Sequence, residues 1–204
     1  MVHARPTVCI VYGFGEGPKH AARLAAELQQ RGFVLTDQAA TANILVAHSG
    51  GIFVLPGDLA DKTVIIMNPA CATTLPYIAT FMHKIAAECL YSMRQRQALR
   101  WARKALYNLW YATTRVAYTM RMIANGLKQY DRLPNMHAAQ VWVVTTQSDP
   151  WARRLPHDEA ARLPQYTYIS YRGSHDSLWL QPEACADIVQ SAYEPRLLAT
   201  ARTR

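Results

Sequence analysis

The sequence predicts an α/β fold, with a mostly parallel sheet of about six strands, flanking helices and a helical cap insertion. Short runs rich in β-branched and aromatic residues recur along the chain. Most of these runs are apolar without alternation, which is typical of strands buried on both faces of a parallel sheet. The 204 residues, half of them hydrophobic, suffice for one domain with a sizeable core.

The predicted elements follow one another in a simple order. A strand at residues 7–12 (TVCIVY) ends in the glycine-rich stretch GFGEG. A helix rich in Ala, Leu, Glu and Gln follows at residues 20–31, and Gly32 ends it. The remaining strands are expected at residues 33–35, 42–47, 62–67, 141–145 and 166–171.

A long helical insertion, residues 75–133, is expected between the fourth and fifth strands of a single domain spanning residues 1–204. Its apolar residues recur at steps of three and four, which places them on one helix face. This stripe comprises Leu99, Ala102, Leu106, Leu109, Thr113, Val116, Met120 and Ile123. We expect the stripe to line an apolar pocket over the sheet edge that carries the site.

The formal net charge of +8 is concentrated in the insertion, where acidic residues are scarce between Met93 and Gln129. The basic residues there are Arg94, Arg96, Arg100, Arg103, Lys104, Arg115, Arg121 and Lys128. A solvated face explains such a charge most simply, and the aromatic residues beside it are expected to pack the cap rather than to stack on nucleic acid. The basic cap is also suited to weak contact with an anionic membrane surface.

Other features predict a cytoplasmic protein without a metal or cofactor. The four cysteines are Cys9, Cys71, Cys89 and Cys185. No two are close in sequence, which favours reduced thiols over a metal or redox pair. No apolar stretch reads as a signal peptide or membrane span. The histidines outside the motifs below lack ligand-like spacing, and the sequence does not indicate an oligomeric state.

The stretch AHSGG, residues 47–51, carries the first chemical motif. It directly follows a buried strand, and a nucleophile on a sharp strand-to-helix turn needs small residues two positions before and after it. Ala47 and Gly51 occupy those positions. Ser49 is therefore the candidate nucleophile, and the N–H of Gly50 is a candidate donor to the oxyanion.

Two further motifs follow later strands. Asp149 in QSDP comes directly after the fifth strand, and His175 in GSHD comes after the last one. Each alone is more typical of an ordinary turn or loop, but the order Ser, Asp, His past successive strands is that of a catalytic triad. Asp158 and Asp176 are expected to be solvated acids.

Over nearly its full length the chain resembles the α/β-hydrolase superfamily. AHSGG corresponds to the nucleophile elbow of the family, QSDP to its acid loop and RGSHDSLW to its histidine loop. The resemblance implies a serine esterase or lipase-like enzyme that cleaves an ester-like bond of a small molecule, with no nucleic-acid partner. It also implies that YGFG leads to the second oxyanion donor, the N–H of Phe14, and that residues 75–133 form the cap.

The sequence departs from the family pattern at four points. Ala47 replaces the usual first glycine of the elbow, and Tyr12 stands where histidine is common. The first two strands of the family are missing. Pro56 and Gly57 cut short the helix that follows the elbow.

Two alternatives remain open at this stage. Gly13 and Gly15 follow a strand and precede a helix, and Asp37 ends the second strand, as in a Rossmann-like dinucleotide-binding protein. Pro18 stands where that motif has its third glycine. The other alternative is a non-catalytic interaction protein that uses the hydrolase fold as a scaffold.

Overall fold

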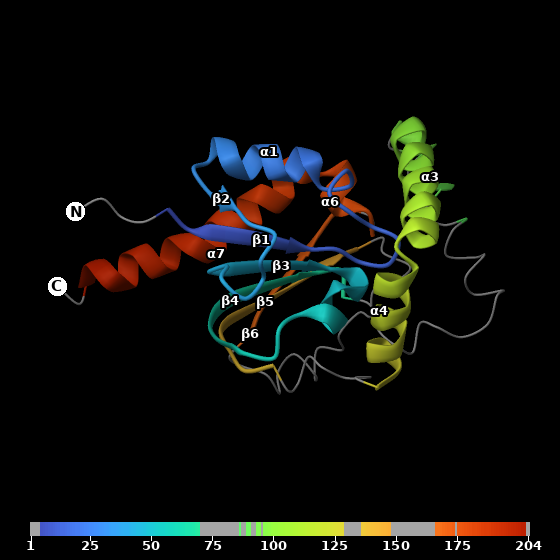
Figure 1. Ribbon diagram of the computed structural model, residues 1–204. Helices are drawn as coiled ribbons and strands as arrows, with labels where there is room; N and C mark the ends of the chain where they lie inside the picture. Colours follow the sequence, from blue (N-terminus) through green and yellow to red (C-terminus); the bar gives the residue numbers. More distant parts are fainter. Residues whose placement is uncertain are drawn as a thin grey trace.

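A six-stranded sheet forms the centre of the molecule, in the order β2-β1-β3-β4-β5-β6 (Figure 1). Every pairing between neighbouring strands is parallel. This confirms the predicted α/β fold and its mostly parallel sheet of about six strands. The computed structural model describes residues 5–69, 86, 89–90, 93–94, 96–128, 136–147, 166–173 and 175–202.

The observed elements lie close to the predicted ones. The strands are β1 (Thr7–Val11), β2 (Val34–Leu35), β3 (Ile44–His48), β4 (Leu59–Met67), β5 (Ala138–Thr146) and β6 (Tyr166–Tyr171). The helices are α1 (Ala22–Gln30), the 3-10 helix η1 (Ser49–Val54), α3 (Ala98–Thr114), α4 (Val116–Lys128), α6 (Ser177–Leu180) and α7 (Pro182–Arg202). Both ends of the predicted insertion, residues 75 and 133, lie outside the described residues.

The central strands are apolar on both sides because helices cover both faces of the sheet. Side chains of α1, α6 and α7 pack on one face, among them Leu24, Leu178 and Val189. On the other face, Phe53 of η1 and Met122 of α4 pack against the strands. Burying an aliphatic or aromatic side chain of this size stabilises the fold by about 1.5–3 kcal/mol, so this two-sided core holds the sheet rigid.

All carboxyl ends of the parallel strands lie at one edge of the sheet. The loops after β1, β3, β4 and β6 meet there, next to the amino-terminal ends of η1 and α6. In Figure 1, α3 stands beside this edge and α4 continues from it toward η1. Open parallel sheets place their ligand sites at this edge.

Candidate functional site

A sharp turn at the end of β3 exposes the hydroxyl of Ser49. The backbone φ of Ser49 is 50°, in the left-handed region that residues with a Cβ seldom adopt. The turn fits closely against β1, because a Cβ at position 51 would lie 2.4 Å from the carbonyl oxygen of Val11. A Cβ at position 13 would lie 2.9 Å from the Cβ of Ser49. The two glycines therefore permit the close approach of the turn at Ser49 to the loop after β1.

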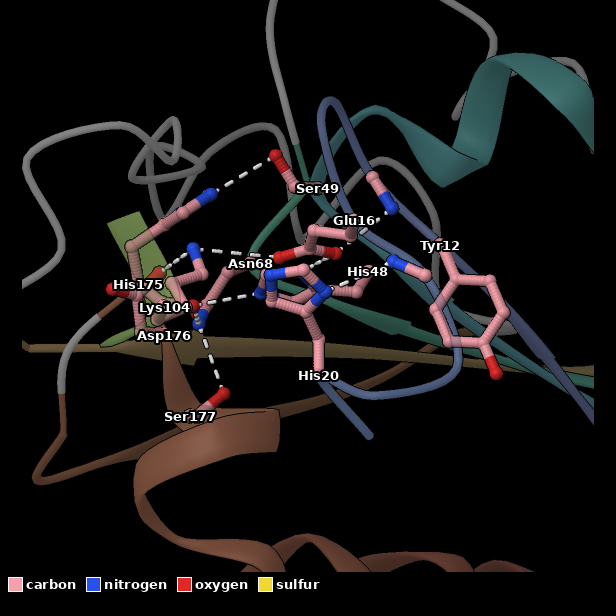
Figure 2. A network of polar contacts seen from close by, with 12 residues as sticks. Tyr12, Glu16, His20, His48, Ser49, Asn68, Lys104, His175, Asp176 and Ser177 are labelled. Carbon is pink, nitrogen blue, oxygen red and sulfur yellow. Dashed lines mark hydrogen bonds and ion pairs between the residues drawn. The ribbon is translucent and has the colours of Figure 1, made fainter. Parts of the chain in front are cut away.

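His175 comes from the loop after β6 and meets Ser49 across the edge of the sheet. Its Nε2 lies 2.9 Å from the Oγ of Ser49, within hydrogen-bond distance (Figure 2). The two residues are 126 positions apart in sequence, so the contact depends on the order of the strands. Asp149 and Asp158, two of the sequence's candidate acids, lie outside the described residues.

The two backbone groups expected to hold an oxyanion also lie beside Ser49. A Cβ at position 50 would lie 3.7 Å from the backbone nitrogen of Phe14 and 2.7 Å from the Sδ of Met122. The loop after β1 and the start of η1 thus run side by side, and α4 covers them. Gly50 itself is buried, whereas the side chain of Phe14 is exposed.

Two buried side chains hold the backbone of His175. Its carbonyl oxygen accepts a hydrogen bond from the Nε2 of His48 at 2.7 Å and another from the Nδ2 of Asn68 at 3.0 Å. Asn68 is fixed in turn, because its Oδ1 accepts from the backbone N–H of Thr146 at 3.0 Å. The ends of β3, β4 and β5 therefore position the loop that carries the histidine.

His48 also contacts a buried carboxylate in the glycine-rich loop. Its Nδ1 lies 2.8 Å from the Oε2 of Glu16, and the same oxygen accepts the N–H of Gly13 at 2.9 Å. Burial alone would raise the pKa of Glu16. His48 lowers that pKa through its charge and its hydrogen bond, and the charge of Lys104 and the N–H of Gly13 lower it further. The pKa of Glu16 therefore lies well below its usual range. The two ring nitrogens of His48 therefore face two oxygen atoms, one of the Glu16 carboxylate and one of the His175 backbone.

Lys104 of α3 completes a buried ionic cluster, which we define as Glu16, His48, Lys104 and Asp176. The Nζ of Lys104 pairs with the Oδ1 of Asp176 and lies 3.5 Å from the Oε1 of Glu16. Asp176 is only 4% exposed and Lys104 only 6%. The expectation of a solvated acid at Asp176 is therefore wrong, because a lysine of the helical insertion reaches it. The ionic cluster thus brings two carboxylates together with the ammonium group of Lys104 and the imidazole of His48.

Several solved structures are similar to this chain. The thioesterase domain from the curacin biosynthetic pathway matches with a TM-score of 0.54 at 13% sequence identity, covering 91% of each chain. An extracellular α/β-hydrolase from a Paenibacillus species matches with a TM-score of 0.55 at 11% identity, covering 92% of this chain and 98% of that one. A laboratory-evolved variant of potato epoxide hydrolase matches with a TM-score of 0.58 at 10% identity, covering 94% and 93%.

The chain has the α/β-hydrolase fold. No protein-family model and no curated protein matches the sequence. Within the α/β-hydrolase fold, η1 follows the nucleophile turn and ends at Val54, as expected from Pro56 and Gly57. In the described part of the chain, no three metal-ligating side chains gather closely enough to hold an ion, and no helix is long and apolar enough to span a bilayer.

The helical insertion contacts the candidate site with the face opposite to the one predicted. The buried residues of α3 are polar or aromatic: Lys104 reaches the ionic cluster, and a Cβ at position 17 would lie 2.5 Å from the ring of Tyr111. The apolar stripe points to solvent, as the 70% exposure of Leu106 illustrates. The prediction that the stripe lines a pocket over the site is therefore wrong from Leu99 to Met120.

A cavity of about 630 Å³ lies beside the site, between β1 and α4. Tyr12, Tyr118 and Glu16 are among its lining residues, whereas Ser49 and His175 are not. Burial is the largest influence on both tyrosines and raises the pKa of each to about 12. Both phenols are therefore neutral hydrogen-bonding groups at physiological pH, and the hydroxyl of Tyr118 donates to the carbonyl oxygen of Tyr12 at 3.0 Å.

Proposed function

We propose that this protein is a serine hydrolase that cleaves an ester-like acyl bond of a small molecule through an acyl-enzyme. The observation that carries the proposal is the 2.9 Å contact between the Oγ of Ser49 and the Nε2 of His175. A hydroxyl within hydrogen-bond reach of an imidazole is the arrangement that activates serine as a nucleophile. The positive φ of Ser49 supports the same role, because it is the strained turn of a nucleophile elbow.

In the proposed reaction, His175 takes the proton of Ser49 as the hydroxyl oxygen attacks the carbonyl carbon. The N–H groups of Phe14 and Gly50 donate hydrogen bonds to the oxyanion that forms. His175 then protonates the leaving group, and a water molecule repeats the steps on the acyl-enzyme. Asp149 is the proposed partner of the second ring nitrogen of His175. The sequence of steps needs no metal or cofactor.

The thioesterase among the similar structures offers the chemistry nearest to this proposal, since thioesters and oxygen esters are both cleaved at an acyl carbon. The dinucleotide alternative receives less support from the glycine-rich loop. The N–H of Gly13 already donates to the carboxylate of Glu16. A pyrophosphate would need that N–H group, and it would meet a negative charge instead.

A fluorophosphonate probe tests the proposal directly, because it labels a serine only where that serine is activated. We expect peptide mapping to find the label on Ser49, and Ser49→Ala to abolish it. Hydrolysis of p-nitrophenyl esters of graded chain length would then define the acyl group. Absence of labelling in the folded protein would favour the non-catalytic scaffold, and a label on another serine would refute the assignment of Ser49.

A further inference from the structure

We propose that the outer face of α3 and α4 binds the surface of an anionic lipid bilayer. This outer face consists of six large apolar side chains, each at least half exposed: Leu99, Leu106, Leu109, Trp110, Val116 and Met120. Single exposed leucines are ordinary on protein surfaces, but the four residues on α3 recur at helical spacing and so share one face, which is typical of a site of interaction. The proposal is independent of the proposed hydrolysis.

The polar side of α3 is turned inward, so its exposed apolar side has no role in the core. Lys104 and Tyr111 are the buried residues of this helix. Lys104 is held by the ionic cluster, and Tyr111 packs on the loop after β1, where its ring centroid lies 5.5 Å from that of His20. These contacts orient α3 and leave Leu106 and Leu109 facing outward. An amphipathic helix in this orientation is suited to a partner outside the molecule.

The charges around the outer face select an anionic partner. Residues 93–128 contain eight basic residues and no acidic one, whereas the other basic and acidic residues of the chain number fourteen each. The whole net charge of +8 therefore belongs to this segment. Arg103 is exposed and lies four residues after Leu99 and three before Leu106, so it borders the apolar residues on the helix surface.

A lipid surface satisfies both kinds of side chain at once. Leucine and tryptophan side chains enter the boundary between headgroups and acyl chains, while arginines remain at the level of the anionic headgroups. A nucleic acid would pair with the arginines but leave the leucines in water. A second copy of this chain would bury the leucines but bring two positively charged faces together.

Vesicle sedimentation tests the proposal with the full chain. We expect binding to vesicles of phosphatidylcholine mixed with phosphatidylglycerol, and much weaker binding to phosphatidylcholine alone. Raising the salt from about 0.1 M to about 1 M shortens the screening length from about 10 Å to about 3 Å and should release the protein. Ser49→Ala should bind as the natural sequence does, which separates this test from that of the proposed function.

Two variants and their controls locate the binding face. Leu106→Gln with Leu109→Gln keeps good helix formers and should weaken binding by about tenfold or more per leucine. Arg100→Gln with Arg103→Gln should weaken it by about fivefold per arginine. Val34→Gln on β2 and Arg5→Gln before β1 change an exposed apolar residue and an exposed arginine elsewhere on the molecule and should have no effect.

Three results would overturn the proposal. One is the absence of binding to the anionic vesicles, and another is binding that both variants retain in full. The third is self-association in the absence of vesicles that the leucine variant abolishes, which would assign the face to a second copy of the chain. Circular dichroism of each variant shows that a loss of binding does not reflect unfolding.

Discussion

Replacing Lys104 by methionine is the sharpest perturbation of the ionic cluster. Methionine keeps the length and packing of the side chain but removes the ammonium group that Asp176 and Glu16 share. Both carboxylates are about 95% buried, so solvent does little to compensate them. Breaking a buried ion pair by removing one partner costs about 3–5 kcal/mol. For a domain of this size, that corresponds to a fall in Tm of about 6–20 °C.

The double variant Lys104→Met with Asp176→Asn supplies the matched control. It removes one positive and one negative charge together, so Asp176 is no longer left as a buried carboxylate without its ammonium partner, and the double variant should be more stable than Lys104→Met alone. Urea unfolding followed by circular dichroism gives the free energy of unfolding for both single variants and the double variant. We expect a coupling energy of about 2–3 kcal/mol. Additivity to within about 0.5 kcal/mol would refute the coupling of Lys104 with Asp176.

Three further predictions concern the proposed site and its surroundings. Ser49→Ala should reduce esterase turnover by several orders of magnitude, and near-normal turnover would exclude the acyl-enzyme route. Asp149→Asn should reduce turnover by about three to four orders of magnitude, as the wrong histidine tautomer does in other triads, and a mild effect would contradict the choice of acid. The pKa of His20 is lowered mainly by burial, and its Nδ1 accepts the N–H of Gly17. The contribution of neutral His20 to the stability of the fold is therefore complete above the ordinary histidine pKa of about 6.5 and is lost as the pH falls below that value. Urea unfolding at about pH 7 and about pH 5 measures how much stability each protein loses between the two pH values. This loss should be smaller for His20→Asn than for the natural sequence, and equal losses would refute this account.

The strands could be predicted from sequence because burial on both faces leaves a simple pattern. The run at residues 42–47 is apolar throughout, and β3 was found at Ile44–His48 with every residue buried. The contact of Ser49 with His175 was also predictable, since parallel strands bring their carboxyl ends to one edge. Helix α7 lacked a comparable signal and was not predicted, because its apolar residues do not form one clear stripe.

The orientation of the insertion could not be predicted from the same kind of pattern. Steps of three and four residues identify a helix face, but they do not say whether that face meets the core or another molecule. The apolar side of a helix is usually assumed to face the core. Here the opposite side of α3 faces inward, because Lys104 on that side pairs with Glu16 in the loop after β1. Glu16 is the one charged residue in the stretch GFGEG, and Lys104 lies on the side of the helix opposite the stripe. Their pairing could have been suspected from these two positions, but only the fold brings them within 3.5 Å.

The ionic cluster matters for the proposed chemistry as well as for stability. The cluster holds the backbone of His175 through the Nε2 of His48, so it sets the position of the imidazole over Ser49. The proposed mechanism therefore assigns position to the ionic cluster and stabilisation of the imidazolium to Asp149, so Asp149→Asn should lower turnover without loosening the hold on the backbone of His175.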